Sequence, residues 1–396
     1  MKGSGAAAAM CAAPSHPKEE RVHERADEKT NKAPGWPVQG AAVRVGVAAE
    51  VAAAAGDDMP AVLQHEEGTV TVEENPAGGS RVRVSVDDPS TFVSRGECAT
   101  TYNLGLIRQI LDVKGPAWLC DEIARDQDPG YVQRTLLPAL TGFVAQERFA
   151  GARMLDFGSG SGASTMLLAR TFPGCEIVGV ELEPRLLALA EARRHFYGFG
   201  SRVRFVASPA GDVLPPGIGR FDFVVLNAVF EHLLPDERRT LLPLLWSSLK
   251  PDGVLFVNAT PSRWYPVEFH TSGLPLLAFL PDSVALRLAH RYSKRVRNSE
   301  TWPQLLRGGI RGGSLAQLRR IIRAGCGEEP VVLHPLHAAG VIAFWFTTTS
   351  ATKHRSALKR AMRRVIAVGA RLPAPVQRSA GILLLPDLTV ALQRPS

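Results

Sequence analysis

Alternation of apolar and polar residues is the first ordered pattern along the chain. The stretches 69–73 and 81–86 place valine at every second position, and the turn-forming stretch Asn75-Pro-Ala-Gly-Gly79 lies between them. A period of two around such a turn predicts a β-hairpin. Because a lone hairpin is only marginally stable in water, we expect this one, within residues 61–95, to dock on another part of the chain.

A helical period follows between Thr100 and Phe143. Its apolar residues recur every three or four positions on two helix faces, one formed by Leu104, Ile107, Ile110 and Leu111 and the other by Leu136, Leu137, Leu140 and Phe143. This spacing predicts amphipathic helices. We expect them to form a helical lead-in that covers one side of a site located further along the chain.

Beyond residue 150, short apolar stretches alternate with helical ones. The stretches expected to form strands are 152–156, 176–181, 203–207, 223–227, 254–259, 331–334 and 341–347. The stretches expected to form helices are 163–170, the segment that begins at Pro184, 235–249 and 315–324. Such alternation predicts an α/β fold with a doubly wound, mainly parallel sheet.

The first 60 residues differ in composition from the rest. They are rich in Ala, Gly, Pro, Lys and Glu and poor in aromatic residues, which predicts a disordered leader, with a transit segment as the alternative. No stretch approaches the roughly 18 apolar residues of a membrane span. The five cysteines are spread widely without a Cys-x-x-Cys pair, which argues against a disulfide framework or a zinc knuckle and for a reducing, cytoplasmic location.

Positive charge is concentrated in a C-terminal tail, residues 349–396. Residues 351–396 contain nine lysines and arginines and one acid, which accounts for the whole formal net charge of +8. A high pI that belongs to a tail does not indicate a nucleic-acid-binding core. Within 353–371, apolar residues recur at helical spacing between basic ones. We expect either a helix on a membrane surface or a helix packed on the domain with a solvated basic face.

A glycine-rich stretch, residues 154–162, is the most informative feature of the chain. An apolar strand ends there at Asp156 and is followed by three glycines, Gly158, Gly160 and Gly162. Strand, glycine turn and helix bring backbone N–H groups close to a nucleotide. With Glu181 about 20 residues further on, the pattern also fits a dinucleotide-binding oxidoreductase. Asp156 argues against that alternative, because a carboxylate there repels a pyrophosphate and suits a ligand with an ammonium and a sulfonium group.

Four segments resemble the motifs of class I S-adenosylmethionine-dependent methyltransferases, in the branch of methyltransferase types 11 and 12. They are, in chain order, Met154–Gly162, Val178–Pro184, Phe221–Leu233 and Leu249–Leu255. The resemblance covers roughly residues 100–348, and we place the domain at 96–348. It implies a seven-stranded, Rossmann-like sheet whose last hairpin strand is antiparallel, with S-adenosylmethionine as cofactor.

The resemblance also implies a set of cofactor ligands. The expected residues are Asp156, Gly158, Gly160, Gly162, Glu181, Ser208, Asp212, Asn227 and Tyr102. Among them, Glu181 is expected at the ribose and Tyr102 against the methionine end. The family often places an acid after the third strand for the adenine amino group, but this chain has Ala207-Ser208-Pro209 there. Either Asp212 reaches back, or Ser208 and backbone groups serve instead.

Residues 260–313 are expected to cap the acceptor pocket. They follow the fifth strand and resemble a segment that some bacterial members carry there, at the carboxyl ends of the strands. Long insertions at such places are usually functional lids. His270 with Glu268 is the preferred catalytic candidate, and Glu231-His232 is the alternative pair. The opposing interpretation gives these side chains a structural role in fixing loops, and we expect no metal ligands.

These features predict a methyltransferase that acts on oxygen of a small-molecule, glycan or lipid acceptor. The enzyme would align the acceptor with the methyl group, and His270 would take up the proton of a hydroxyl. Two alternatives stay open: an NAD(P)-dependent oxidoreductase, and a non-catalytic S-adenosylmethionine-binding scaffold that acts at a membrane surface through its tail. The expected location is the cytoplasm, with peripheral membrane contact through 353–371 as a further hypothesis and no nucleic-acid partner.

Overall fold

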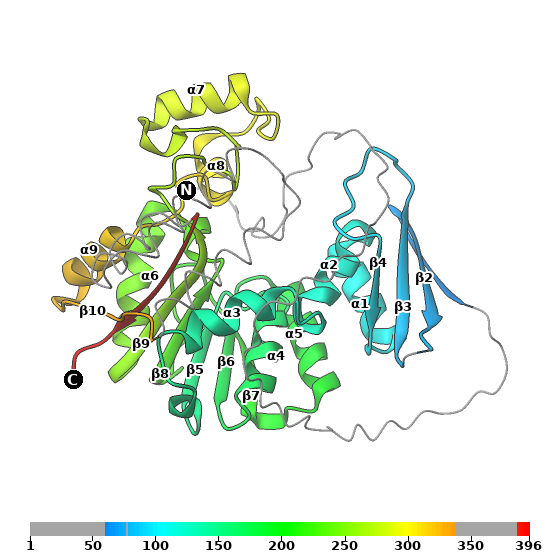
Figure 1. Cartoon of the computed structure of the whole chain (residues 1–396), viewed down its shortest axis with the longest axis horizontal. Helices are drawn as coiled ribbons and strands as arrows, with labels where there is room; N and C mark the ends of the chain where they lie inside the picture. Colours follow the sequence, from blue (N-terminus) through cyan, green and yellow to red (C-terminus); the bar gives the residue numbers. More distant parts are fainter. Residues whose placement is uncertain (1–59, 77, 337–385) are drawn as a thin grey trace, which may run out of the picture.

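The computed structural model describes residues 60–76, 78–336 and 386–396. The expected disordered leader and the basic segment 353–371 therefore lie outside the described residues. Figure 1 shows a small sheet near the start of the described chain and a larger sheet that carries most of the helices. Among the described residues, no helix combines the length and the apolar composition that crossing a membrane requires.

The small sheet is antiparallel, with the strand order β1-β2-β3-β4. Its strands are β1 (Ala61–His65), β2 (Gly68–Glu74), β3 (Ser80–Val86) and β4 (Glu97–Thr100). The predicted hairpin is confirmed as β2 and β3, in a register that pairs Val72 with Val82. Two strands without a clear alternating pattern, β1 and β4, join it on either side. β4 lies beyond residue 95, where the hairpin segment was expected to end.

The small sheet packs on the first helices. These are α1 (Leu104–Lys114), α2 (Pro116–Gln127) and α3 (Val132–Thr141), the predicted lead-in. α1 begins at Asn103, whose Oδ1 accepts a hydrogen bond from the Leu106 N–H at 2.9 Å. One buried cluster joins the strands to α1 and α2, and it includes Leu63, Val70, Val82, Ile107, Ile110, Leu119 and Ile123. The expected docking of the hairpin is therefore confirmed.

The main sheet has seven strands in the order β10-β11-β9-β8-β5-β6-β7. They are β5 (Arg153–Phe157), β6 (Glu176–Glu181), β7 (Val203–Ala207), β8 (Phe221–Asn227), β9 (Leu249–Pro261), β10 (Val331–Val332) and β11 (Asp387–Gln393). β11 pairs antiparallel with both of its neighbours, and β5 to β9 pair in parallel. This arrangement confirms the predicted doubly wound, mainly parallel sheet.

The antiparallel strand comes from a part of the sequence other than the expected one. It is β11, from the segment assigned to the C-terminal tail, and the expected strand 341–347 lies outside the described residues. The sheet therefore extends past residue 348, the expected end of the domain. β11 carries the buried run Leu388 to Leu392, and no alternation marks that run as a sheet strand.

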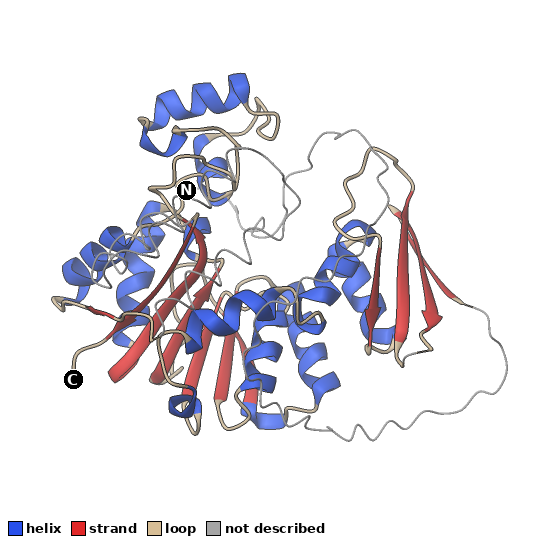
Figure 2. Ribbon diagram, viewed as in Figure 1, coloured by secondary structure: helices blue, strands red, loops and turns tan. Residues whose placement is uncertain are grey.

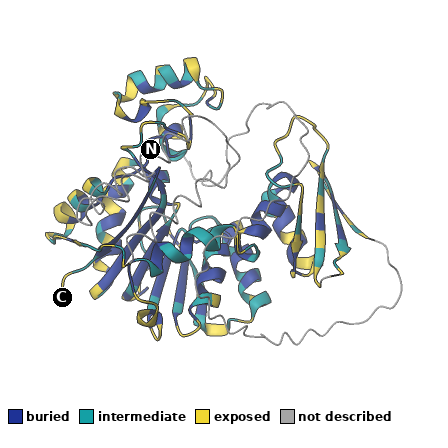
Figure 3. Cartoon of the chain, in the orientation of Figure 1, coloured by how far each residue is buried: buried dark blue, intermediate teal, exposed yellow. Residues whose placement is uncertain are grey.

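Helices cover both faces of the main sheet (Figure 2). α3 and α4 (Ala163–Thr171) lie on one face, and α6 (Pro235–Ser247) and α9 (Leu315–Cys326) lie on the other. Alternate residues of β8 supply the two cores: Phe223 and Val225 face α3 and α4, while Val224 and Leu226 face α6 and α9. α5 (Pro184–Tyr197) packs beside α4 and α1. Figure 3 shows the central strands of this sheet buried along most of their length.

The expected insertion, residues 260–313, begins and ends beside β9, where Ser262 pairs with Gly313 in an isolated bridge. It contains the short turn η4 (Leu277–Phe279) and the helices α7 (Asp282–Tyr292) and α8 (Trp302–Arg307). Its own buried cluster consists of Leu277, Ala285, Ala289, Val296, Leu305 and Ile310. Figure 1 shows α7 and α8 as a separate group at one end of the main sheet. Three further short turns, η1 (Gln146–Phe149), η2 (Gly200–Arg202) and η3 (Phe230–His232), link other elements.

Candidate functional site

The glycine loop between β5 and α4 has an open side and a closed side. Gly158, Gly160 and Gly162 all have positive φ, at 74°, 56° and 81°. A Cβ at Gly158 would lie 2.6 Å from Val229 Cγ2, and one at Gly162 would lie 2.8 Å from Ala190 Cβ. At Gly160, by contrast, no atom of the described residues, apart from its chain neighbours, lies within 4 Å of the place a Cβ would take. The outer two glycines therefore serve close packing, and the middle one leaves backbone exposed to a ligand.

Two carboxylates lie at the carboxyl ends of the neighbouring strands β5 and β6. Asp156 is 2% exposed, and its Oδ2 accepts a hydrogen bond from Thr165 Oγ1 at 2.6 Å. Burial, and to a smaller extent the charge of Glu181, raises the pKa of Asp156 to about 6. Glu181 accepts hydrogen bonds from the backbone N–H groups of Gly160, Leu182 and Glu183, at 2.7 to 3.0 Å. The sequence motifs around Asp156 and Glu181 thus meet at the loop.

The arrangement of these groups fits S-adenosylmethionine. Two buried carboxylates favour a positively charged ligand over a phosphate. Ser159 Oγ, in the same loop, is buried and has no hydrogen-bond partner among the described residues, so it can serve a ligand. In this arrangement Asp156, Ser159, Glu181 and the backbone at Gly160 would hold the amino-acid and ribose parts of the cofactor.

The residues expected near adenine occupy one loop after β7. Ser208 is buried, and its hydroxyl lies 2.7 Å from the carbonyl oxygen of Ala210 and 2.8 Å from that of Val213. The hydroxyl therefore holds the loop together, and its single proton is used within it. Asp212 is half-buried in the same loop. Of the two expected adenine ligands, Asp212 is the better placed to turn toward a ligand.

Asn227 belongs to a series of side-chain hydrogen bonds that links β8, β9 and β11. Asn258 Nδ2 donates to Asn227 Oδ1, and Thr389 Oγ1 donates to Asn258 Oδ1, both at 2.8 Å. The residues after these asparagines, Ala228 and Ala259, have φ of 55° and 56°. Left-handed backbone at a residue other than glycine is uncommon and often accompanies functional sites. The carboxyl ends of β8 and β9 are therefore held in a special conformation.

Tyr102 takes a place other than the expected one against the methionine end of the cofactor. It is 1% exposed and packs edge-on against Phe196, with ring centroids 5.0 Å apart. Its hydroxyl donates to Asp126 at 2.7 Å and accepts from Arg193 Nε at 3.1 Å. Tyr102 is buried and its hydroxyl is hydrogen-bonded on both sides, so it stabilises the glycine loop through Arg193.

Sequence patterns missed the network that braces the glycine loop. Arg193 of α5 is fully buried and donates to the Ser161 carbonyl at 2.8 Å and to Glu122 Oε1 at 2.9 Å. The Ser161 hydroxyl donates to Glu122 as well. Burial alone would raise the pKa of Glu122, but Arg193, with Arg125 and Lys114, lowers it to about 2. The sequence offered one signal for this network: Glu122 in α2 and Arg193 in α5 are charged residues at positions that face the apolar core.

Glu268 was expected to act with His270 in catalysis, but both of its carboxylate oxygens bind backbone and hydroxyl groups of its own loop. Its Oε1 accepts from the backbone N–H of His270 at 2.9 Å and of Thr271 at 2.8 Å. Its Oε2 accepts from the backbone N–H and the hydroxyl of Ser272 at 2.5 and 2.6 Å. Both oxygens therefore shape the loop that carries His270. In the same segment, Trp264 is 47% exposed and lies 6.1 Å from the Phe279 ring, between centroids.

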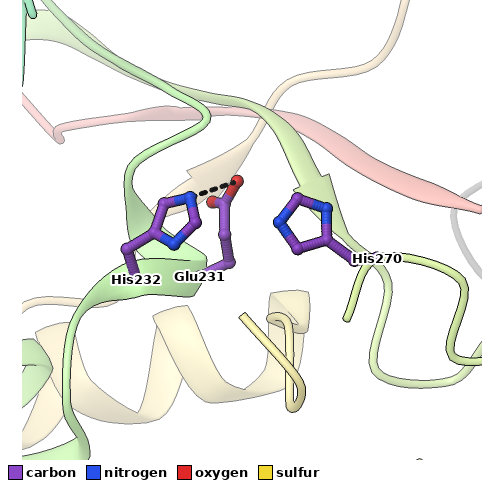
Figure 4. A group of neighbouring side chains, drawn as sticks. All are labelled: Glu231, His232 and His270. Carbon is purple, nitrogen blue, oxygen red and sulfur yellow. Dashed lines mark ion pairs between the residues drawn. The ribbon is translucent and has the colours of Figure 1, made fainter. Parts of the chain in front are cut away.

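His270 joins the alternative catalytic pair, Glu231 and His232, in one cluster (Figure 4). The His232 and His270 ring centroids are 5.7 Å apart, and His232 Nε2 lies 3.8 Å from Glu231 Oε1. Glu231 is fully buried, which raises the pKa of its carboxyl. Burial and the charge of Glu231 likewise raise the pKa of Asp387, on β11, to about 7. The cluster therefore combines imidazole and carboxyl groups where β8 and β9 end.

A groove of about 980 Å³ lies between α1 and α5, apart from both the glycine loop and the cluster of Glu231, His232 and His270. Asn103, Gln109, Asp112, Arg185 and His195 contribute polar groups to its wall. None of the expected site residues lines it, so we do not assign the cofactor or the acceptor to it.

Comparison with known proteins identifies a methyltransferase domain in residues 155–255. Carboxy-S-adenosyl-L-methionine synthase of Erwinia tasmaniensis is 30% identical over 36% of this chain and 59% of its own length. Trans-aconitate 2-methyltransferase of Delftia acidovorans is 28% identical over 52% of this chain and 72% of its own. Among solved structures, a putative sarcosine dimethylglycine methyltransferase from Galdieria sulphuraria is 17% identical, with a TM-score of 0.34, over 62% of this chain and 79% of that one.

The methyltransferase domain in residues 155–255 and the similarity to methyltransferase relatives support the class I S-adenosylmethionine-dependent methyltransferase that the resemblance implied. S-adenosylmethionine is the cofactor of this class, which favours it over a nicotinamide cofactor. The chain spans about three fifths of the length of the first relatives it matches. Their similarity therefore supports the cofactor-binding domain and leaves the acceptor of this protein to be proposed.

Proposed function

We propose that this protein transfers the methyl group of S-adenosylmethionine to an oxygen atom of a small-molecule, glycan or lipid acceptor. The observation that carries the proposal is the open loop at Gly160, which lies between the buried carboxylates of Asp156 and Glu181. The family match to residues 155–255 supports the same chemistry. The choice of oxygen rests on the imidazole cluster, because a hydroxyl must lose its proton and an amine need not do so through a placed base.

The cofactor, when bound, supplies an electrophilic methyl group on a positively charged sulfur. Asp156 and the backbone at Gly160 would orient that group. The acceptor would enter at the carboxyl ends of β8 and β9, under the segment 260–313. Its hydroxyl oxygen would be held in line with the methyl group, and alignment with exclusion of water supplies most of the acceleration in such a displacement.

We propose that one of two imidazoles, of His232 or His270, receives the acceptor proton. Burial and the neighbouring His232 lower the pKa of His270 to about 4, so its ring is neutral at physiological pH but weakly basic. His232 Nδ1 lies 2.6 Å from the Arg307 carbonyl oxygen. Because a carbonyl only accepts hydrogen bonds, Nδ1 carries the proton and Nε2 presents a lone pair. His232 is therefore the better oriented base, and His270 stays the second candidate.

The proposal is tested by incubating the full chain with methyl-labelled S-adenosylmethionine and fractionated cell extracts. The label should move into a compound that gains one methylene in mass and that resists acid cleavage as an ether does. The Gly160→Leu variant should transfer no label, because its side chain fills the open side of the loop, while Gly200→Leu should transfer as the wild type does. Binding of the cofactor without transfer to any fraction would favour a non-catalytic scaffold.

Membrane contact through 353–371 stays a proposal, supported by the basic and apolar spacing of that sequence. Removing residues 351–396 is not a clean test, because it also deletes β11 from the main sheet. Replacement of Arg360, Arg363 and Arg364 by Gln leaves β11 in place. Sedimentation with anionic vesicles should fall for this variant, and equal sedimentation would refute membrane contact.

A further inference from the structure

We infer that Glu231, His232 and His270 form a binding site for one divalent transition-metal ion of the zinc type. One ligand atom from each side chain lies within 4.8 Å of the others. Figure 4 shows both imidazole rings turned toward the Glu231 carboxylate, from opposite sides. Glu231 and His232 belong to η3, just after β8, and His270 belongs to the loop after β9. The fold therefore brings together three ligands from two segments of the chain.

An unsatisfied oxygen points into this cluster. Glu231 is fully buried, and its Oε2 accepts a hydrogen bond from Thr260 Oγ1 at 2.8 Å. Its Oε1 has no hydrogen-bond partner among the described residues. A buried carboxylate oxygen without a partner destabilises a fold, because its lost hydration is not replaced. A cation between Oε1 and the imidazoles would satisfy it.

The tautomer of His232 is set for coordination. Its Nδ1 donates to the Arg307 carbonyl oxygen, so the lone pair on Nε2 faces Glu231 Oε1 at 3.8 Å. Two lone pairs facing each other repel unless a proton or a cation lies between them. Histidine ligands of metal ions commonly donate their other N–H to a backbone carbonyl in this way.

Gly309 leaves room for the third ligand, His270, beside Glu231. A Cβ at Gly309, which has φ of +87°, would lie 2.7 Å from His270 Cδ2, 3.1 Å from His270 Nε2 and 3.3 Å from Glu231 Cγ. Any other residue at this position would push the imidazole and the carboxylate away. Arg238, also buried, donates to the Glu231 carbonyl oxygen at 3.0 Å and so fixes η3 from below.

The ligand set indicates the kind of ion. Two imidazoles and one carboxylate suit zinc and its neighbours, whereas magnesium and calcium prefer oxygen ligands alone. Zinc bonds of about 2.0–2.2 Å place tetrahedral ligand atoms roughly 3.4 Å apart. The 3.8 Å separation of His232 and Glu231 therefore needs a small contraction, and the wider separations, up to 4.8 Å, need a larger one. Three protein ligands leave a fourth position open.

The open position gives the ion a role that rests on the proposed function. It lies where the acceptor is proposed to enter, and an acceptor hydroxyl bound to the ion would lose its proton more easily, with solvent water taking it up. In that case the imidazoles act as ligands, and neither is the base. The ligand class assigned to this position is an oxygen donor such as a hydroxyl or a phenol.

The test uses the full chain, treated with chelator and then titrated with Zn²⁺ by calorimetry and with Co²⁺ by its visible absorption. One ion should bind per chain, and Mg²⁺ should not compete. His270→Ala is the first variant, because His270 lies on a surface loop and the loss of its imidazole should not impair folding. Affinity should fall about tenfold or more. Glu231→Gln should do the same, and His195→Ala, a histidine on α5 outside the cluster, should bind as the wild type does.

Absence of binding, or binding that survives in both His270→Ala and Glu231→Gln, would overturn the metal site. Circular dichroism of each variant shows that a loss of metal is not a loss of fold. S-adenosylmethionine binding is measured on the same samples. Because the cofactor residues lie at β5 and β6, failure of the metal site leaves cofactor binding intact, while failure of the proposed function removes cofactor binding or methyl transfer and leaves metal binding unaffected.

Discussion

The two halves of the main sheet build their sites in different ways. At β5 and β6, the site consists of a short continuous loop, three glycine conformations and one acid at the end of each strand. At β8 and β9, Glu231, His232 and His270 meet only because η3 and the loop after β9 fold against each other, with Gly309 between them. The first half depends on backbone conformation, and the second depends on tertiary packing. Substitutions at β5 and β6 should therefore act through the backbone of the glycine loop, and substitutions at β8 and β9 through the packing of η3 against the loop after β9.

The largest effect is expected in the buried Arg193–Glu122 network, which supports the glycine loop at β5 and β6 through packing. Arg193→Leu leaves the Glu122 carboxylate buried without its closest cation, which should lower the free energy of unfolding by about 3–5 kcal/mol. Arg194→Leu is the matched control, since Arg194 makes a partly exposed pair with Glu191 and a hydrogen bond to the Gly200 carbonyl oxygen at 2.7 Å. Its loss should lower the free energy of unfolding by less, about 1–2 kcal/mol. Urea denaturation of both variants decides this, and equal losses would show that the buried network is not the support of the loop.

The next effect separates backbone conformation from the ligand it serves. Gly160→Leu places a side chain in open space, so S-adenosylmethionine affinity should fall about 100-fold, or about 2.7 kcal/mol. Gly200 has the same φ of 56° and the same open surroundings, so Gly200→Leu carries the same backbone penalty of roughly 1 kcal/mol without touching the site. Calorimetric titration of both variants gives the difference. If the two bind the cofactor equally, the loop is not the cofactor site.

Asp156→Asn should separate binding from stability. Asn lacks the charge that meets the cofactor, so affinity should fall about tenfold. Because the pKa of Asp156 is raised to about 6 in the folded protein, its ionisation opposes folding, and wild-type stability should decline as pH rises from about 4 to 6. The variant should lack this decline and be about 1–3 kcal/mol more stable than the wild type at pH 8. Denaturation at pH 5 and pH 8 measures it, and an equal difference at both pH values would contradict the assignment.

The smallest effect concerns the second half. Glu268→Gln replaces an oxygen that accepts from the backbone with a nitrogen that cannot, so the 270–272 loop should open more readily, by about 1–2 kcal/mol. Amide hydrogen exchange at Thr271 should be about tenfold faster, while cofactor affinity should not change. Unchanged exchange would mean that other contacts hold the loop.

The same contrast explains how much the sequence could predict. The strands β5 to β9 and the glycine loop follow from local signals, because the apolar period, Asp156 and the glycines lie within a few residues of each other. β11 could not be predicted, because its place next to β9 depends on a partner more than 100 residues away. The role of Glu268 was also missed, since a carboxylate beside a histidine in sequence says nothing about which backbone groups it meets. The contacts of Tyr102 were also missed, because its partner Arg193 lies 91 residues away on α5.

The most direct test of this account compares cofactor binding in one variant from each half. S-adenosylmethionine is titrated by calorimetry into Asp156→Asn and His270→Ala at pH 7.5. The division of the site predicts about tenfold weaker binding for Asp156→Asn and wild-type affinity for His270→Ala. Weaker binding in His270→Ala of similar size, or wild-type affinity in Asp156→Asn, would contradict it.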